Sequence, residues 1–393
     1  MNPERCIAFL QELIHTPSLP GQEGELAALV LAEMQQLGYD AAWQDDAGNV
    51  IGLIRGRGEA PAVMFNTHLD HVDPGDPRAW SHQPYGGAIA AGKVWGRGAC
   101  DIKGPLAAQL YGVAALRVTD GPPPGDVYVT ATVQEEVGGL GARFLLSHLG
   151  PTLVVVGEPS ANTLRRGHRG RTELALHVKG RAAHASAPER AINPHFVVSN
   201  FVQRLPTLTM RQHAELGASS VAPTLIRTDQ TSANVIPGEM WLTLDWRNVP
   251  GESGEDACTV LQPLVEASLI PGAKAEVEIP VVERRSFTGL TMRIPADNPA
   301  YSLPADHPAI TAAAAILEQT FGQSVPIGHW RFATDGGHFA QAGMLVVGYG
   351  PGDESLAHTV REHIAIEGIE VALRGNAALA RGLAMEYDQR RSG

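Results

Sequence analysis

Cysteine and basic charge are both scarce in this sequence. Only three cysteines occur among 393 residues, and Cys6, Cys100 and Cys258 lie far apart. An odd number of distant cysteines predicts neither a disulfide framework nor a cysteine-based metal site. Acidic residues outnumber Lys and Arg by 42 to 30, which gives a formal net charge of −12. We therefore do not expect the basic face of a general nucleic-acid binder, and nucleic acid is not an expected partner.

Long hydrophobic runs are missing as well. No stretch reaches the roughly 18 consecutive apolar residues that a membrane span needs, so we expect no membrane partner. The first residues, MNPERCIAFLQELI, carry charge early and lack the small-residue cleavage site of a signal peptide. These features predict a cytoplasmic protein. Because 44% of the residues are hydrophobic, the chain has ample material for ordered cores.

Strand-like and helical segments alternate in the first 160 residues. Apolar runs that fit buried strands cover residues 62–65, 127–133 and 153–156, and helical stretches cover residues 105–116 and 142–149. This alternation predicts an α/β sheet. Each strand-like run leads directly into a polar cluster, and ligands of open α/β sheets bind beyond the carboxyl ends of the strands. We therefore expect the functional site at that edge.

The pattern changes near residue 171. Strand-like segments then cover residues 172–178, 221–227, 240–246 and 273–279, and helical ones cover residues 194–205 and 255–268. Their order, β-α-β-β-α-β, is the ferredoxin-like arrangement. The α/β pattern resumes with a helix over residues 308–321 and a buried strand over 344–349. We predict one α/β domain, residues 1–171 and 286–393, interrupted by a small domain at residues 172–285.

Five histidines and carboxylates follow these strands or lie in glycine-rich loops. They are His68, Asp101, Glu136, Glu158 and His358. Histidine and carboxylate ligands without cysteine are typical of catalytic zinc or a similar divalent metal. Taken singly, each is weak evidence, and Asp101 could instead cap the helix that follows it.

Two further acidic residues lie beside these candidates. Asp70 follows His68 by two positions, and a metal-bound imidazole usually donates its other N–H to a carboxylate. The alternative is that Asp70 caps a turn. Glu135 is adjacent to Glu136, and neighbouring side chains of an extended segment point in opposite directions. We therefore expect one metal ligand and one base, against the alternative of a solvated acidic turn.

Taken together, these segments resemble the M20 metallopeptidase family, which includes acetylornithine deacetylase, succinyl-diaminopimelate desuccinylase, aminoacylase-1 and glutamate carboxypeptidase. The motifs are THLD at residues 67–70, GACDIKG at 98–104, EE at 135–136, GEPS at 157–160 and AHT at 357–359. The resemblance covers essentially the whole chain. It implies a zinc-peptidase-like α/β catalytic domain that is interrupted by a lid and dimerisation domain.

The resemblance also implies roles for the site residues. Two zinc ions, for which cobalt can substitute, would share Asp101. His68 and Glu158 would bind one ion, and Glu136 and His358 the other. Glu135 would be the general base acting on a metal-bridging water, and Asp70 would orient His68.

The small domain carries a motif, GRAAHASAP at residues 180–188, that is similar to the family's lid motif. In some dimeric members its histidine, here His184, reaches the neighbouring subunit's active site and stabilises the oxyanion. Asn234 and Arg247 match lid positions that often hold the substrate's carboxylate, a role that suits the planar guanidinium. A surface histidine and a sheet-edge ion pair are the alternatives. The resemblance implies a homodimer.

The predicted function is a dinuclear zinc hydrolase that cleaves the amide bond of small N-acyl amino acids. A dipeptidase or carboxypeptidase with the same site is the nearest alternative, and a non-catalytic small-molecule-binding homologue is a third. The expected partner is therefore a small amide or a short peptide. The segment WRFATDGGH at residues 330–338 differs from the acetylornithine and desuccinylase patterns, so neither of those specificities is expected. Arg331, Asp335 and His338 are candidates for the substrate pocket, and packing or loop-capping roles are the alternative.

Overall fold

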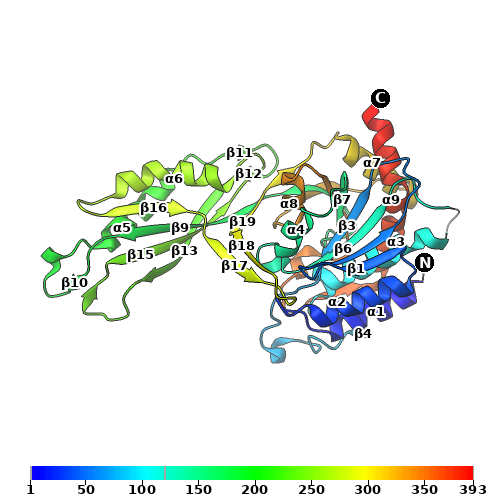
Figure 1. Ribbon diagram of the computed structural model, residues 1–393, viewed down its shortest axis with the longest axis horizontal. Helices are drawn as coiled ribbons and strands as arrows, with labels where there is room; N and C mark the ends of the chain where they lie inside the picture. Colours follow the sequence, from blue (N-terminus) through cyan, green and yellow to red (C-terminus); the bar gives the residue numbers. More distant parts are fainter. Residues whose placement is uncertain (1, 119–120, 393) are drawn as a thin grey trace.

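The computed structural model describes residues 2–118 and 121–392, which form a larger and a smaller lobe (Figure 1). Within these residues, the larger lobe is built on a nine-stranded sheet in the order β1-β2-β6-β3-β7-β22-β8-β20, with β21 paired to β8. The strands are β1 (Ala41–Gln44), β2 (Val50–Ile54), β3 (Val63–His68), β6 (Val127–Thr132), β7 (Leu153–Val156), β8 (Leu164–His168), β20 (Tyr301–Ser302), β21 (Ile327–Trp330) and β22 (Leu345–Gly348). The central strands β6, β3, β7 and β22 are parallel. They are apolar runs because both faces of a parallel sheet are covered.

Helices cover both faces of this sheet. The helices of the larger lobe are α1 (Pro3–His15), α2 (Gly24–Gln36), α3 (Gly104–Ala114), α4 (Leu140–Leu145), α7 (Pro308–Phe321), α8 (Gly336–Gln341) and α9 (Ile366–Ser392). Alternate residues of β3 enter different cores, since Val63 and Phe65 pack with α1, α3 and α9, whereas Met64 packs with α4 and α8. This period of two is what a strand between two helical layers requires.

The smaller lobe has its own antiparallel sheet and its own core. The chain runs through β9 (Arg171–Lys179), α5 (Pro194–Arg204), β13 (Ser220–Thr228), β15 (Glu239–Arg247), α6 (Gly254–Ser268) and β16 (Lys274–Glu278). The strand order in space is β13-β15-β9-β16. Leu174, Leu176 and Leu242 point inward and pack against Phe201 and Leu261 of the two helices. The predicted fold class, an α/β domain interrupted by a β-α-β-β-α-β unit, is confirmed.

A β-hairpin returns the chain from the smaller lobe to the larger one. It consists of β17 (Val281–Arg285) and β18 (Thr291–Pro295), and β19 (Asp297–Asn298) then pairs with β9. The hairpin tip contacts the larger lobe, where the Thr288 hydroxyl donates to the carbonyl of Asp46 at 2.6 Å. The predicted domain limit after residue 285 falls inside this hairpin, and the domain limits remain a prediction.

Smaller sheets complete the two lobes. They comprise β4 (Ala88–Ala90), β5 (Lys93–Trp95) and β23 (His363–Ala365); β10 (Ala183–His184) with β14 (Val235–Ile236); and β11 (Gln212–His213) with β12 (Gly217–Ala218). Among the described residues, no helix is both long enough and apolar enough to cross a membrane.

Candidate metal centre

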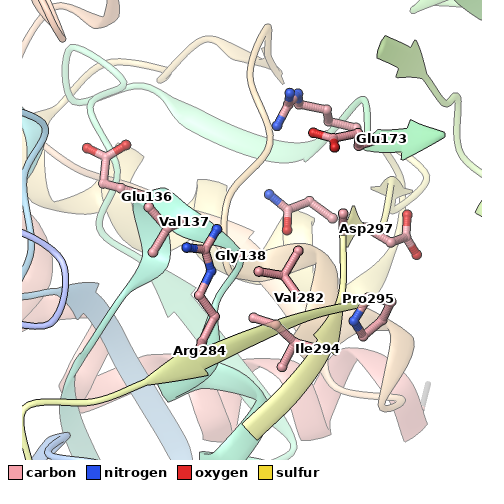
Figure 2. A pocket seen from close by; sticks show the side chains of 12 residues that line it. Glu136, Val137, Gly138, Glu173, Val282, Arg284, Ile294, Pro295 and Asp297 are labelled. Carbon is pink, nitrogen blue, oxygen red and sulfur yellow. The ribbon is translucent and has the colours of Figure 1, made fainter. Parts of the chain in front are cut away.

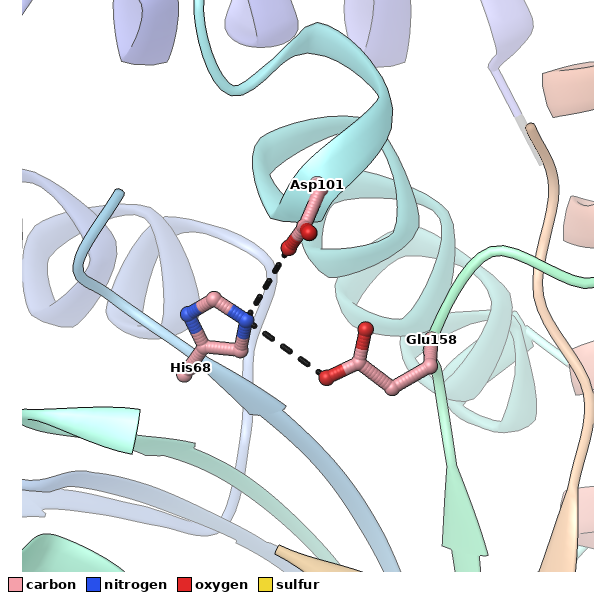
Figure 3. A group of neighbouring side chains, drawn as sticks. All are labelled: His68, Asp101 and Glu158. Atoms are coloured by element: carbon pink, nitrogen blue, oxygen red, sulfur yellow. Dashed lines mark ion pairs between the residues drawn. The ribbon is translucent and has the colours of Figure 1, made fainter. Parts of the chain in front are cut away.

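Three predicted ligands meet beyond the carboxyl ends of the central strands. His68 is the last residue of β3, Glu158 lies two residues after β7, and Asp101 lies in η2 (Ala99–Lys103), directly before α3. The His68 Nε2 atom is 3.2 Å from Asp101 Oδ1 and 3.5 Å from Glu158 Oε1 (Figure 3). All three residues are buried. The polar clusters that follow the strands therefore converge as expected.

A second group shares Asp101 with the first. The His358 Nε2 atom is 3.3 Å from Asp101 Oδ2 and 3.0 Å from Glu136 Oε1. In each group of three, the potential ligand atoms lie within 4.8 Å of one another. Asp101 thus turns one carboxylate oxygen toward each histidine.

The spacing of these atoms fits two divalent cations. Tetrahedral zinc with bonds of roughly 2.0–2.2 Å holds its ligand atoms about 3.3–3.6 Å apart. The distances between neighbouring atoms here are 3.0–3.5 Å. In addition, Asp101 Oδ1 is buried, and apart from the ion-pair contact with His68 it accepts no hydrogen bond from the described residues. A bound cation would satisfy that oxygen.

Asp70 connects His68 to the two glutamates. The His68 Nδ1 atom is 2.9 Å from the main-chain carbonyl oxygen of Asp70 and 3.4 Å from its carboxylate. The two carboxylate oxygens accept the backbone N–H groups of Glu135 and Glu136, at 3.0 and 3.1 Å. Asp70 therefore fixes the imidazole chiefly through its main chain and the glutamate turn through its side chain.

The geometry of the glutamate pair corrects the sequence interpretation. The pair does not lie in an extended segment, because Glu135 and Glu136 begin the 3₁₀ turn η4 (Glu135–Val137) after Gln134, whose φ is 56°. Both glutamates line one cavity together with the ligand candidates. Only Glu136 belongs to a metal-ligating group among the described residues, which leaves Glu135 free to act on a proton.

Several carboxylates crowd into this cavity, and burial raises the pKa values of Glu135, Glu136 and Glu158. Burial raises the pKa of Glu135 well above its usual range, and the charges of Asp335, Glu158 and Glu136 add to this. Burial and then the charge of Asp101 raise the pKa of Glu158 to about 7. Hydrogen bonds to Asp101 and Glu136 raise the pKa of His358 to about 10. Bound cations would offset this negative charge and favour the ionised carboxylates.

Sequence reasoning missed Glu362, which holds the loop that carries Asp101. Its carboxylate accepts the backbone N–H groups of Cys100 and Asp101, both at 3.0 Å. It also pairs with Arg97 at 2.5 Å, and both side chains are buried. The only available signal was its position four residues after His358.

The segment at residues 330–338 contributes a wall of the cavity, but not through the predicted residues. Phe332 and Ala333 line the cavity, whose volume is about 250 Å³. Asp335 is buried and accepts the Thr132 hydroxyl at 2.8 Å. His338 is also buried, and Arg331 is exposed. None of these three residues is among those that line the cavity.

Two of the lid candidates, His184 and Asn234, lie apart from this centre within the chain. His184 in β10 and Val235 in β14 are paired, and the carbonyl of Asn234 accepts the N–H of Ala185 at 2.9 Å. Figure 1 places β10 at the end of the smaller lobe that points away from the larger lobe. Arg247 binds Asp245 through Nε at 2.6 Å, as in the sheet-edge alternative. The roles predicted for His184, Asn234 and Arg247 remain predictions.

Comparison with known proteins identifies the family. A sequence profile of the peptidase family M20/M25/M40 matches residues 64–382. The chain belongs to the M20 peptidase family. The protein is therefore a metal-dependent hydrolase of amide or peptide bonds, with the fold of that family.

Relatives of this M20 protein span nearly its whole length. It is 30% identical over 361 residues to YgeY of Escherichia coli (strain K12), which covers 90% of this chain and 88% of that protein. It is 29% identical to a succinyl-diaminopimelate desuccinylase of Cereibacter sphaeroides, covering 93% and 95% of the two chains. The solved structure of YxeP from Bacillus subtilis, described as a dinuclear metal-binding M20 peptidase, has a TM-score of 0.71 at 18% identity and covers 96% of this chain and 97% of its own.

Proposed function

We propose that this M20 protein is a dinuclear zinc-dependent deacylase of small N-acyl amino acids. The observation that carries the proposal is that Asp101 presents one oxygen to His68 and the other to His358, with Glu135 in the same cavity. A full-length relative is named a desuccinylase, which is an acyl-removing enzyme, and YxeP is described as dinuclear.

The proposed ligand sets follow the two groups of side chains. His68 and Glu158 would hold one ion, Glu136 and His358 would hold the other, and Asp101 would contribute to both sets. When bound, the two ions supply Lewis acidity toward the scissile carbonyl and lower the pKa of the attacking water. Imidazole and carboxylate donors without thiolates are a zinc-type set, and cobalt accepts the same ligands.

Glu135 is the proposed general base. Its carboxylate accepts a proton from the attacking water and then delivers that proton to the amine as the amide bond breaks. Burial raises its pKa, which favours holding the transferred proton between these two steps. The backbone of the turn is fixed by Asp70, so the carboxylate keeps its position while the proton moves.

A peptidase that trims dipeptides or C-terminal residues is the second candidate. YxeP is described as a peptidase, and the same ligands and base would serve that reaction. A non-catalytic homologue is disfavoured because every ligand position and the base position are occupied. The cytoplasmic location stays a prediction.

We also propose that the protein acts as a homodimer. Strand β13 is an edge strand of the smaller lobe, with Leu225 and Ile226 exposed at 69% and 58%. Pairing with β13 of a second copy would cover this edge. In such a dimer His184 would stabilise the oxyanion in the partner's site, and Asn234 and Arg247 would assist with the substrate's carboxylate.

The test is amine release by zinc-loaded protein from a panel of N-acyl amino acids and unmodified dipeptides. We expect turnover of the acylated set, and Glu135→Gln should lower kcat by about 10²- to 10⁴-fold while two metal ions per chain stay bound. The matched control is Glu25→Gln, an exposed glutamate on α2, which should change neither value. Preference for dipeptides would select the peptidase, and near-normal turnover by Glu135→Gln would refute the base assignment.

A further inference from the structure

The glutamate turn faces hairpin β17–β18 across a cavity. This cavity has a volume of about 190 Å³, and its lining includes residues 136–138 of the turn and Val282 and Arg284 of β17 (Figure 2). A Cβ atom on Gly138 would lie 3.2 Å from the side chain of Ile294 in β18, so the two elements touch at the far end of the turn. A second contact, at the start of the turn, is a hydrogen bond from a side chain.

Gln134, which directly precedes Glu135, begins this turn. Its φ of 56° lies in the left-handed region, which residues with a side chain rarely adopt. Its N–H donates to the carboxylate of Glu23 at 3.2 Å, and its carbonyl accepts the N–H of Gly139 at 2.8 Å. The next two N–H groups of the turn donate to Asp70. Three consecutive N–H groups thus end on two buried carboxylates, which leaves the Gln134 side chain available for a contact elsewhere.

The Gln134 side chain reaches the hairpin. It is buried, and its Nε2 atom donates to the main-chain carbonyl of Arg285, the last residue of β17, at 2.8 Å. Gly21 lies beside this hydrogen bond, since a Cβ atom there would be 3.7 Å from Gln134 Nε2 and 3.6 Å from the Arg285 oxygen. The N–H of Gly21 donates at 3.0 Å to the same Glu23 oxygen that accepts the N–H of Gln134. Three segments that are distant in sequence therefore meet at one amide group.

The hairpin that accepts this hydrogen bond is fixed at both of its ends. At its base, β19 pairs with β9 of the smaller lobe. At its tip, the Thr288 hydroxyl donates to the carbonyl of Asp46 at 2.6 Å, and the Phe287 ring lies over two glycines of the larger lobe. Arg285 comes directly before this tip in the chain, so the tip contacts fix the carbonyl that Gln134 meets.

We propose that Gln134 is a positioning residue through which hairpin β17–β18 holds Glu135 in its working position. The inference rests on the proposed hydrolase function, in which Glu135 is the base. The base must stay within hydrogen-bond reach of the attacking water and then of the leaving amine, so a small displacement of the turn costs rate. Gln134 does not line the cavity of the metal centre, and it therefore acts through Glu135 and not on the substrate. The position of the base thus depends on a strand that is 151 residues further along the chain.

The first test removes the donor of this hydrogen bond. Gln134→Met keeps the length of the side chain and should lower kcat by about 10-fold, with KM within about 3-fold and the metal content unchanged. Gln36→Met, at the exposed end of α2, is the matched control and should change none of these values. A lower melting temperature with an unchanged kcat per folded molecule would overturn the proposal.

A change at the hairpin tip tests whether the effect passes through the hairpin. Thr288→Val removes the hydroxyl that donates to Asp46 and should lower kcat by about 3-fold. In Gln134→Met protein the same change should cost no further activity, because the link between hairpin and turn is already cut. Thr291→Val, on an exposed side chain of β18, is the control. Losses that multiply in the double variant, or no loss from Thr288→Val, would overturn the proposal.

Hydrogen exchange separates this inference from the proposed function, because it requires no turnover. In metal-loaded protein, Gln134→Met and Thr288→Val should each speed exchange of the backbone amides of Glu135 and Glu136 by about 10-fold and leave β9 unchanged. Faster exchange of the turn in a protein that hydrolyses neither acylated amino acids nor dipeptides would sink the hydrolase and keep the positioning role of Gln134. Unchanged exchange in a protein whose turnover depends on Glu135 would sink the positioning role and keep the hydrolase.

Discussion

At the scale of single residues, Asp70 links two parts of the site that are 65 residues apart in the chain. Both of its carboxylate oxygens accept backbone N–H groups of the turn that bears Glu135 and Glu136. Its main-chain carbonyl faces His68 Nδ1. Such outer partners typically affect metal affinity or activity by about 10- to 100-fold. Asp70 is thus placed to position both Glu135, the proposed base, and His68, a proposed metal ligand.

We expect Asp70→Asn to lower kcat by about 10- to 100-fold with little change in KM. An asparagine keeps one acceptor oxygen but turns an NH₂ group toward one of the two backbone N–H groups, so one hydrogen bond is replaced by two opposed donors. The measurement is steady-state kinetics with metal analysis on the same samples. Asp76→Asn, on an exposed loop, is the control. If Asp70 only stabilised the fold, Asp70→Asn would lower the melting temperature and leave kcat per folded molecule unchanged.

Single-residue contacts could be predicted from the sequence only where the two residues lie close together in the chain. The pairing of His68 with Asp70 was predicted because the two residues are adjacent in sequence. The contact of Asp70 with Glu135 and the support of Asp101 by Glu362 were not, because each joins distant segments only after the sheet has formed. The sequence predicted an extended backbone at Glu135 and Glu136, because nothing in it revealed the positive φ of Gln134.

At the scale of elements, hairpin β17–β18 depends on two glycines of the larger lobe. The ring of Phe287 lies 3.1 Å from the place that a Cβ atom of Gly24 would occupy, and a Cβ on Gly48 would overlap the ring. Gly48 also has a φ of 101°, in the region that side chains rarely adopt. Because these glycines have no side chains, the Phe287 ring packs directly over them, and this contact holds the hairpin against the larger lobe.

We expect Gly48→Ala and Phe287→Ala to be coupled in their effects on stability. Phe287→Ala alone should cost about 2 kcal/mol, below the roughly 3–5 kcal/mol of a fully buried ring, since Phe287 is half-buried. Gly48→Ala alone adds backbone strain to the clash with the ring. In the double variant the clash is absent, so the total loss should be at least about 1 kcal/mol smaller than the sum.

Urea unfolding of the four proteins of this cycle measures the coupling. Gly58→Ala is the control for backbone strain alone, since Gly58 also has positive φ, at 74°, and open space around it. Strictly additive losses would show that the ring does not contact Gly48 in solution.

The elements themselves were predictable to different degrees. The strands of the large sheet were predicted from short continuous apolar runs, because they are buried on both faces. The strands of the small sheet were predicted from alternating apolar and polar residues, because one face is buried. Hairpin β17–β18 was not, because most of its residues are exposed or half-buried and give only a weak apolar signal. Tertiary contacts determine both the pairing of β17 with β18 and the place where the hairpin contacts the larger lobe.

At the scale of the whole molecule, the smaller lobe meets the larger one near the metal centre and carries His184 at its far end. The Arg166 side chain of the larger lobe pairs with Glu215 in the loop between β11 and β12. This ion pair joins the lobes on the side of β8, and the hairpin joins them near the glutamate turn. With the lobes connected in this way, His184 would reach the metal centre of its own chain only after a large rearrangement, whereas in the proposed dimer a second copy paired through β13 would offer another centre.

We therefore expect mixed dimers of two inactive chains to regain activity. Glu135→Gln lacks the base, and His184→Ala should lose about 10²- to 10³-fold through the oxyanion. In a random mixture half of the dimers are hybrids with one intact site, so activity should return to about one quarter of the wild-type value. Adding Leu225→Lys and Ile226→Lys to both chains places charge on the exposed β13 edge and should abolish both the dimer and the recovery. Absence of recovery, with subunit exchange demonstrated by native mass spectrometry, would show that His184 does not act on the partner's site.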